Sequence, residues 1–439
     1  MGLFYLVNHS DQDIRRYSWE VISTTIAIFT SVLIFQGLDG IFVAFVAHLL
    51  VPAGWGDRQR VIVLVSIVHF LCWFTAMHTV VAKLAFGKNS KEGEESQEAA
   101  EAREQEIKCW ATLLSHMTAF AAIATWCDVQ KLPAFAKHPI TSAVPVVMHV
   151  AALFVLFRFT DFVRNVLFGT GGGLREKINM WDEEGEEGEN DLAAISISFL
   201  VVQVIRYAIS GVLGDETGVD LTPRVDTFSC IFTLLAASLL FLTMLFSFVR
   251  LLTRTMSRKR TIEFANDDVP TFHSWEGFDS MRKFLRRWGF ILMDTSGMSF
   301  AWCLLYATKW AVHLASVQFQ LPLAKTETIN GICLALCTSV MACLMIFGIN
   351  WICDRRCSHD IMWKQFRSII RSLGILIGFA WEQSFDAGVE AVAKLAEPKG
   401  LWHALFTKLA LACVVGLVVV PAWRHHILKT VLCLRDKRS

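Results

Sequence analysis

Three carboxylates lie on one face of an apolar segment near the end of the chain. The stretch from Ile369 to Ala393 is long enough to cross the roughly 30 Å core of a bilayer, yet it contains Glu382, Asp386 and Glu390. Because these residues are spaced four apart, a helix places them on the same side. A carboxylate inside a membrane is costly, and it is typical of an ion path, a proton relay or a structural ion pair.

A second apolar segment, 287–315, supplies basic residues that could pair with these carboxylates. Lys309 and His313 lie one helical turn apart in it. The sequence predicts a pair between Lys309 and Asp386 or Glu390, which would neutralise two costly charges. Three interpretations stay open: the pair only orients the helices, it is a titratable site where a cation or proton competes with Lys309, or Lys309 reaches the outer membrane interface instead.

Glu382 lies nearer the middle of its segment and has no obvious partner by spacing. Arg206, in segment 192–213, is the best candidate at a similar depth. A buried carboxylate without a cation tends to hold a proton. Glu382 is therefore either a proton carrier or a neutral, hydrogen-bonded residue that packs helices.

The composition indicates that these residues belong to a polytopic, all-α membrane protein with one membrane domain. The chain has 439 residues and is 54% hydrophobic and 18% charged, whereas soluble domains are about 25% charged. A β-barrel would show short alternating segments instead. Ten apolar segments of spanning length are predicted, namely 20–50, 61–86, 108–130, 142–168, 192–213, 226–252, 287–315, 329–353, 368–393 and 402–423.

Segment 108–130 has the weakest signal of the ten, because it is short and rich in alanine. A protein with nine spanning helices, in which this segment does not cross, is the alternative. With ten spans, the segments 250–287, 354–371 and 424–439 share one side with both termini and contain nineteen Lys and Arg residues, against eight in the five loops opposite. The positive-inside rule then predicts that both termini are cytoplasmic.

Three long cytoplasmic loops are predicted at 88–107, 169–191 and 254–286. The acidic, glycine-containing run 182–191 is typical of a flexible linker. Residues 280–288 contain four basic side chains, in the pairs Arg282-Lys283 and Arg286-Arg287, and the aromatic residues Phe284 and Trp288. This pattern favours a helix that lies on anionic lipid headgroups, although a simple topology signal explains it equally well.

Short proline-containing connections predict that successive segments pair as hairpins, first with second, third with fourth and so on. The charged segments 192–213, 287–315 and 368–393 are predicted to line an interior. Segments 226–252, 329–353 and 402–423 are almost free of charge across their middles and are predicted to face lipid or scaffold. Gly374 and Gly378 would allow another helix to approach closely. Arg158, Asp161 and Arg164 lie near the predicted cytoplasmic end of segment 142–168. The spacing of Arg158 and Asp161 predicts an intrahelical surface pair.

Two tripeptides suggest a weak internal repeat. Phe300-Ala301-Trp302 and Phe379-Ala380-Trp381 are identical and lie 79 residues apart. Repeats are common in transporter folds, and binding sites lie where the repeats meet. Chance similarity between aromatic-rich segments is the other explanation.

These features predict a transporter or channel for a cation, a proton or a small charged solute. The candidate pathway residues are Glu382, Asp386, Glu390, Lys309, His313 and Arg206. The alternative is a scaffold, sensor or assembly subunit whose buried charges only fix helix packing. Because the sequence has no catalytic signature and no metal-ligand spacing within a helix, neither an enzyme nor a metal or other cofactor is expected. The net charge of +1 gives no indication of nucleic-acid binding.

Overall fold

The computed structural model describes residues 6–50, 58–86, 97–168, 175–214, 228–265, 276–319, 327–356, 360–396, 398 and 400–436. Within these ranges the regular elements are helices and there is no strand, so the predicted all-α membrane fold is confirmed. The elements are α2 (Gln12–Leu50), α3 (Arg58–Phe86), α4 (Gln97–Gln130), α5 (Pro139–Ser142), α6 (Val144–Phe168), α7 (Arg175–Ser210), α8 (Phe228–Ala265), α9 (Glu276–Gln318), α10 (Glu327–Arg356), α11 (Asp360–Ala396), α12 (Leu401–Ala422), the π-helix η5 (Trp423–Leu428) and α13 (Lys429–Asp436).

Nine helices in the described part of the chain are long and apolar enough to cross a membrane. They include Ala99–Gln130, the segment with the weakest sequence signal. Among the long helices in these ranges, α11 is not apolar enough to be counted with the nine, because Glu382, Gln383 and Asp386 interrupt its apolar stretch. It is nonetheless largely buried among its neighbours, and Leu373 and Ala380 are fully enclosed.

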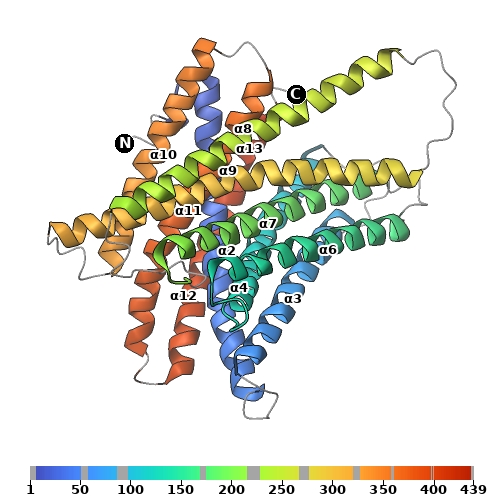
Figure 1. The fold of residues 1–439 in the computed structure, drawn as a ribbon. Coiled ribbons are helices and arrows are strands. Elements are labelled where there is room, and N and C mark those ends of the chain that lie inside the picture. The colour runs from blue at the N-terminus through green and yellow to red at the C-terminus, as the bar shows by residue number, and fades with distance from the viewer. Residues whose placement is uncertain are drawn as a thin grey trace.

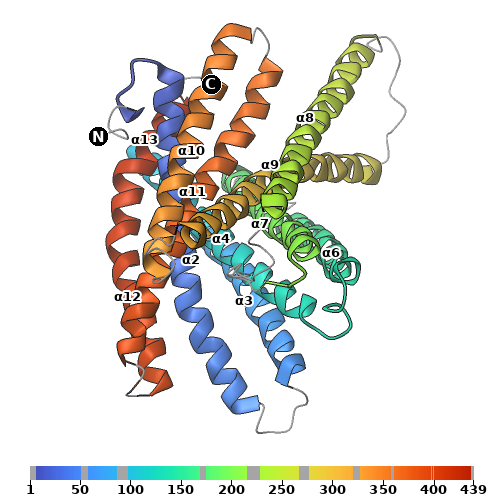
Figure 2. The same cartoon turned by 60° about the vertical axis from the view of Figure 1, so that its left-hand side comes forward.

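The long helices form two sets that cross. Figure 1 shows α2, α10, α11 and α12 running upright and α6, α7, α8 and α9 running across them. After a rotation of 60° the two sets still diverge (Figure 2). Where they meet, α2 packs on α4, α4 on α7, α7 on α9, α9 on α11 and α11 on α2. These contacts close a ring of helices, and the core of the protein lies in it.

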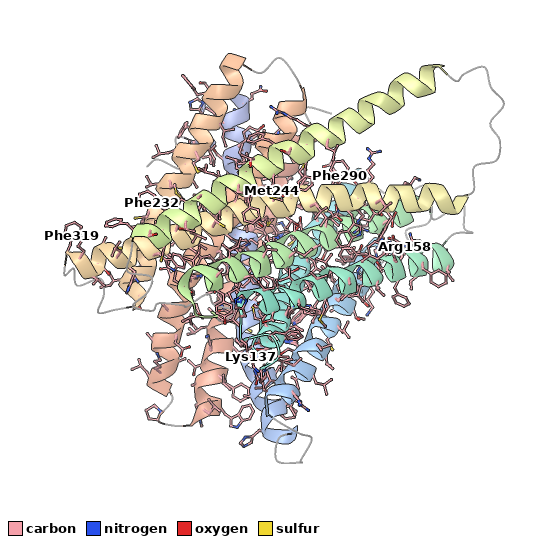
Figure 3. The ribbon with its side chains drawn as sticks, in the orientation of Figure 1. Lys137, Arg158, Phe232, Met244, Phe290 and Phe319 are labelled. Carbon is pink, nitrogen blue, oxygen red and sulfur yellow. The ribbon has the colours of Figure 1, made fainter. Side chains whose placement is uncertain are left out.

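The remaining helices lie outside the ring. In α8, α10 and the span Leu401–Leu434, only 28%, 22% and 11% of the apolar window is buried, against 72% in α7 and 78% in α9. The prediction that the charged segments lie inside and the uncharged ones outside is therefore confirmed. Phe232 and Met244 are among the exposed apolar side chains of α8 (Figure 3). Such a surface suits contact with lipid.

The predicted hairpin partners are in contact with each other, but they are not the consecutive helices that pack most extensively. Among consecutive helices the most extensive packing joins α3 to α4, α8 to α9 and α10 to α11. These are the second and third, sixth and seventh, and eighth and ninth of the predicted segments. A short connection limits only the distance between two helix ends, whereas packing depends on which faces carry apolar and small residues.

Glycines bring α11 close to α2, as the sequence predicts. The hydroxyl of Thr25 donates a hydrogen bond of 3.2 Å to the carbonyl oxygen of Gly374. A Cβ added at Gly378 would lie 3.0 Å from the carbonyl oxygen of Thr25 and 3.1 Å from Cβ of Ile28. Because there is no room for a side chain at Gly378, the backbones of α2 and α11 pack directly on each other.

The three predicted cytoplasmic loops are largely helical where the structure describes them. α4 begins at Gln97, α7 at Arg175, α8 continues to Ala265 and α9 begins at Glu276. The rest of segments 88–107, 169–191 and 254–286 lies outside the described residues. The run 182–191 is not a linker but a packed part of α7, because its glycines face other helices. A Cβ at Gly188 would lie 3.3 Å from Sδ of Met77.

Candidate functional site

Four of the predicted pathway residues line one cavity of about 400 Å³. α2, α4, α9, α10, α11 and α12 contribute to its wall, and we call it the Glu382 cavity. Its polar and charged lining residues are Gln36, Asp39, Lys309, Asn330, Glu382, Gln383, Asp386, Glu390 and Lys408. The carboxylates spaced four apart on α11 thus lie together, as their spacing predicts.

Glu382 is the most deeply buried carboxylate of this cavity, with 1% of its surface exposed. The side chain of Gln36 lies beside its carboxylate, and the charges of Asp386, Lys408 and Lys309 act on it. Its Oε1 atom is buried and has no hydrogen-bond partner among the described residues. Glu382 therefore keeps an unsatisfied acceptor within the wall of the cavity.

The partner of the other two carboxylates differs from the prediction. Nζ of Lys408, on α12, lies 3.1 Å from Oδ1 of Asp386 and 3.2 Å from Oε2 of Glu390. Lys309 lines the same cavity from α9, and its Nζ lies 3.5 Å from Oε1 of Gln383. Lys408 is about two helical turns inside an otherwise apolar segment, so its partner cannot be found from spacing within one helix.

Arg206 is not the partner of Glu382. Its guanidinium lies 3.6 Å from the ring centroid of Tyr306 and 5.9 Å from that of Phe199, and 1% of the residue is exposed. Among the described residues, neither Arg206 nor His313 belongs to the lining of the Glu382 cavity. Arg206 instead stacks on aromatic rings of α7 and α9.

Asp39 reaches the Glu382 cavity from α2 and is held from behind by a histidine. Its Oδ1 lies 2.9 Å from Nδ1 of His69. The indole nitrogen of Trp73 donates a hydrogen bond of 2.8 Å to Nε2 of His69. Because an indole N–H is only a donor, Nε2 carries no proton, and Nδ1 is the donor to Asp39. The arrangement fixes the histidine tautomer and orients the Asp39 carboxylate.

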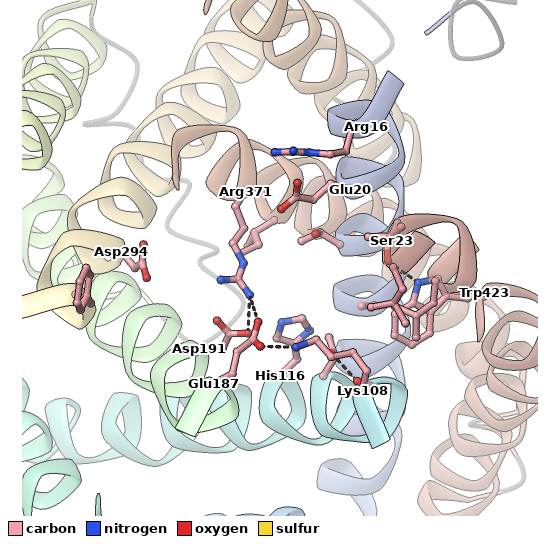
Figure 4. Close-up of a pocket in the computed structure, with 18 of the residues that line it drawn as sticks. Arg16, Glu20, Ser23, Lys108, His116, Glu187, Asp191, Asp294, Arg371 and Trp423 are labelled. Atoms are coloured by element: carbon pink, nitrogen blue, oxygen red, sulfur yellow. Dashed lines mark hydrogen bonds and ion pairs between the residues drawn. The ribbon is translucent and has the colours of Figure 1, made fainter. Parts of the chain in front are cut away.

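A larger cavity of about 630 Å³ lies at the other end of the same helices. We call it the Arg371 cavity, and Figure 4 shows the side chains that surround it. Arg371 pairs with Asp191 at 3.2 Å and with Glu187 at 3.4 Å. Lys108 pairs with Glu187 and also lies 3.1 Å from Glu184. The cavity is thus lined by an alternating network of charges from α4, α7 and α11.

Both ends of the described chain meet at the Arg371 cavity. Arg16 from α2 and Leu432 from α13 line it together. The indole of Trp423, in η5, donates a hydrogen bond of 2.8 Å to Ser23. η5 follows Pro421 inside α12, and π-helical turns are frequent at functional sites.

An aromatic layer one helical turn thick separates the two cavities. On α4, His116 lines the Arg371 cavity and Phe120 the Glu382 cavity, and Ile375 and Phe379 are divided in the same way on α11. A step of four residues is about 6 Å along a helix. The rings of Phe120 and Phe379 stack at 5.9 Å with planes 2° apart, and Trp302 packs edge-on against Phe379 at 4.7 Å.

A third charged cluster is closed and forms around Glu189, which has no exposed surface. Its carboxylate lies 2.6 Å from Arg287, 3.3 Å from Arg164 and 3.2 Å from His78, and accepts a hydrogen bond of 2.6 Å from Thr160. The cluster joins α3, α6, α7 and α9. Its charges are paired within protein, so it acts as a connection between helices.

Two predictions about basic residues change with this cluster. Asp161 pairs at 2.6 Å with Arg164, not with Arg158. The guanidinium of Arg158 lies 4.9 Å from the ring centroid of Phe284. Within the basic stretch 280–288, Arg287 points inward to Glu189, while Lys283 and Arg286 are exposed.

The part of the chain that the structure describes contains no group of three or more His, Cys, Asp or Glu side chains arranged to hold a metal ion. No protein-family model matches the chain, and neither a curated protein nor a solved structure matches it. The fold and the cavities by themselves define a class: a multi-pass α-helical membrane protein with two charged cavities in line.

Several residues of the site carry a signal that sequence reasoning did not use. These are polar or charged residues inside predicted apolar segments: Gln36 and Asp39 in 20–50, Lys408 in 402–423 and Arg371 in 368–393. Each is expensive in a membrane and so marks an interior position. What the sequence could not supply is which of them meet.

Proposed function

We propose that this protein is a transporter for a cation, a proton or a small positively charged solute. The observation that carries the proposal is the alignment of the two cavities along α2, α4, α9 and α11, with the Phe120–Phe379 layer between them. Transporters of known design place their site near the middle of the membrane and open it to one side at a time. Two cavities separated by one layer of side chains suit that mechanism better than an open channel.

The charges of both cavities favour a positively charged solute. In the Glu382 cavity the carboxylates of Asp39, Glu382, Asp386 and Glu390 face two lysines. In the Arg371 cavity four carboxylates, from Glu20, Glu187, Asp191 and Asp294, face three basic side chains, from Arg16, Lys108 and Arg371. An excess of carboxylates raises the local concentration of cations. A solute that leaves one cavity thus meets similar electrostatics in the next.

The layer lies beside a close contact between two helix backbones. Gly378 on α11 packs against Thr25 and Ile28 on α2, one residue from Phe379. A small shift of α11 along α2 would therefore move Phe379 relative to Phe120. The Glu189 cluster, by contrast, is closed and paired, and suits the fixed part of the protein. We assign the Arg371 cavity to the cytoplasmic side, because the positive-inside rule puts the chain ends there.

The alternative function is a scaffold whose charges only pack helices. Labelling of the two cavities from opposite sides of the membrane distinguishes transport from this alternative. Cysteine at Ala387 tests the Glu382 cavity and cysteine at Thr24 the Arg371 cavity. Each is introduced into a background in which the native cysteines, several of which are exposed, are replaced by alanine, and each is probed in oriented liposomes with a membrane-impermeant maleimide. We expect Ala387→Cys to react from the outside and Thr24→Cys from the cytoplasmic side. Ala380→Cys, at a fully buried position, is the control and should stay unlabelled. Labelling of both test positions from one side, or of neither, would contradict two-sided access.

A further inference from the structure

The Glu382 cavity has the size of a site for a small molecule. Its volume of about 400 Å³ lies within the range of about 300–1,000 Å³ that is usual for ligand pockets. A dehydrated hard metal ion such as Ca²⁺ needs at least about six oxygen ligands at roughly 2.3–2.6 Å. Here Lys408 already holds Asp386 and Glu390. The cavity is better matched to a larger cation.

Aromatic side chains form the apolar part of the wall. Phe35, Phe120 and Phe379 line the cavity together with Glu382. The face of a phenylalanine ring attracts an ammonium group, and it also packs against hydrocarbon. A ligand with a positive end and an apolar body would meet both kinds of surface.

Two buried acceptors indicate how the positive end is bound. Oε1 of Glu382 and Oε1 of Gln36 are both buried and have no hydrogen-bond partner among the described residues. Both residues line the cavity, and each acceptor left without a donor costs stability. A ligand with N–H donors would satisfy both, whereas a quaternary ammonium ion has no N–H and would satisfy neither.

We propose that the Glu382 cavity binds the primary or secondary ammonium group of a small organic cation. The group donates hydrogen bonds to Oε1 of Glu382 and Oε1 of Gln36, and the apolar body lies against Phe120 and Phe379. This names the substrate class of the transporter proposed above and so rests on that proposed function.

Three probes that share a benzyl group separate the contributions of charge and hydrogen bonding. Benzylammonium has both, benzyltrimethylammonium has charge without N–H donors, and benzyl alcohol is neutral. Binding to the purified, full-length protein in detergent is measured by isothermal titration calorimetry. We expect benzylammonium to bind at least tenfold more tightly than each of the other two. Equal binding of the three, or no binding of benzylammonium, would overturn the proposal.

Two variants assign the binding to the cavity. Glu382→Gln should weaken benzylammonium binding at least tenfold, while Glu104→Gln, at an exposed carboxylate of α4, should leave it unchanged. Phe379→Leu keeps an apolar side chain but removes the ring, and should weaken binding about two- to thirtyfold. If Glu382→Gln elutes as an aggregate in size-exclusion chromatography, the Phe379→Leu variant decides whether the ligand binds in the cavity. Unchanged affinity in a well-folded variant of either residue would place the ligand elsewhere.

Flux measured on the same preparations separates the two proposals. If the liposomes move alkali cations or protons but the protein does not bind benzylammonium, this inference fails and transport stands. If benzylammonium binds in the expected order but no cation crosses the membrane, the site stands and transport fails.

Discussion

Nζ of Lys408 lies 3.1 Å from Oδ1 of Asp386. This pair joins α12, which lies outside the ring of helices, to α11, which is part of that ring. About a fifth of each side chain is exposed, 20% for Lys408 and 23% for Asp386. The pair therefore lies at the wall of the Glu382 cavity, where it neutralises a carboxylate without filling the space. Glu382, one turn away, remains free to meet a solute.

A double-mutant cycle tests this pair. Lys408→Met and Asp386→Asn should each lower the free energy of unfolding, and the double variant should lose less than the sum, with a coupling of about 0.5–3 kcal/mol. The reason is that removing one partner leaves the other charge without its counterion. Denaturant unfolding in detergent gives the values. The matched cycle of Lys309→Met with Asp386→Asn should be close to additive, and the reverse order of couplings would restore Lys309 as the partner.

The contact between α2 and α11 predicts a difference between two glycines of one helix. Gly378→Ala should destabilise the protein by about 1–3 kcal/mol, because the new methyl group would lie 3.0 Å from the carbonyl oxygen of Thr25. Gly388→Ala has no atom within 4 Å of its added carbon, so it should be neutral or stabilise the helix by up to about 1 kcal/mol. Equal unfolding midpoints for the two variants would show that the close contact is absent.

The closed cluster on α7 predicts a contrast between two glutamates. Glu189→Gln leaves Arg164 and Arg287 buried without their shared carboxylate, and should cost about 3–5 kcal/mol. Glu183→Gln removes an exposed charge from the same helix and should change stability by less than about 0.5 kcal/mol. Thermal unfolding of the two variants in one detergent makes the comparison. A harmless Glu189→Gln substitution would mean that Glu189 holds no helices together.

The aromatic layer predicts a leak when it is thinned. Phe120→Ala removes one of the two stacked rings and should allow small cations to pass down their gradient through liposomes in which the wild-type protein is tight. Phe406→Ala, at an apolar position that is 56% exposed, is the control and should not leak. Size-exclusion chromatography confirms that both variants are folded. A Phe120→Ala protein as tight as the wild type would move the barrier to another layer.

The fold class follows from the sequence because hydrophobicity is a local property. Ten long apolar segments require helices in a membrane, and their burial follows from where the charges lie, so α7 and α9 are inside and α12 is outside. The spacing of Glu382 and Asp386 likewise fixes a shared face. These are statements about one helix at a time, and the structure agrees with them.

Two of the wrong predictions concern partners that lie on other helices. The acidic run 182–191 resembles a solvated linker until Arg164 and Arg287 supply its counterions from α6 and α9. The sequence predicts Lys309 as the partner of Asp386 or Glu390, while Lys408 supplies the charge from the next helix. Depth along a helix can be read from sequence, but the rotation of one helix against another cannot.

Cation flux through purified protein in liposomes tests the central claim most directly. Wild-type protein and Glu382→Gln are reconstituted at equal density, and uptake of alkali cations, benzylammonium and protons is followed with and without a pH gradient. The account predicts cation uptake above that of protein-free liposomes by the wild type, and loss of that uptake and of its pH dependence in Glu382→Gln, because glutamine keeps the shape but not the charge. A wild-type protein that moves none of these cations, or a Glu382→Gln protein with full activity and an unchanged pH profile, would contradict it.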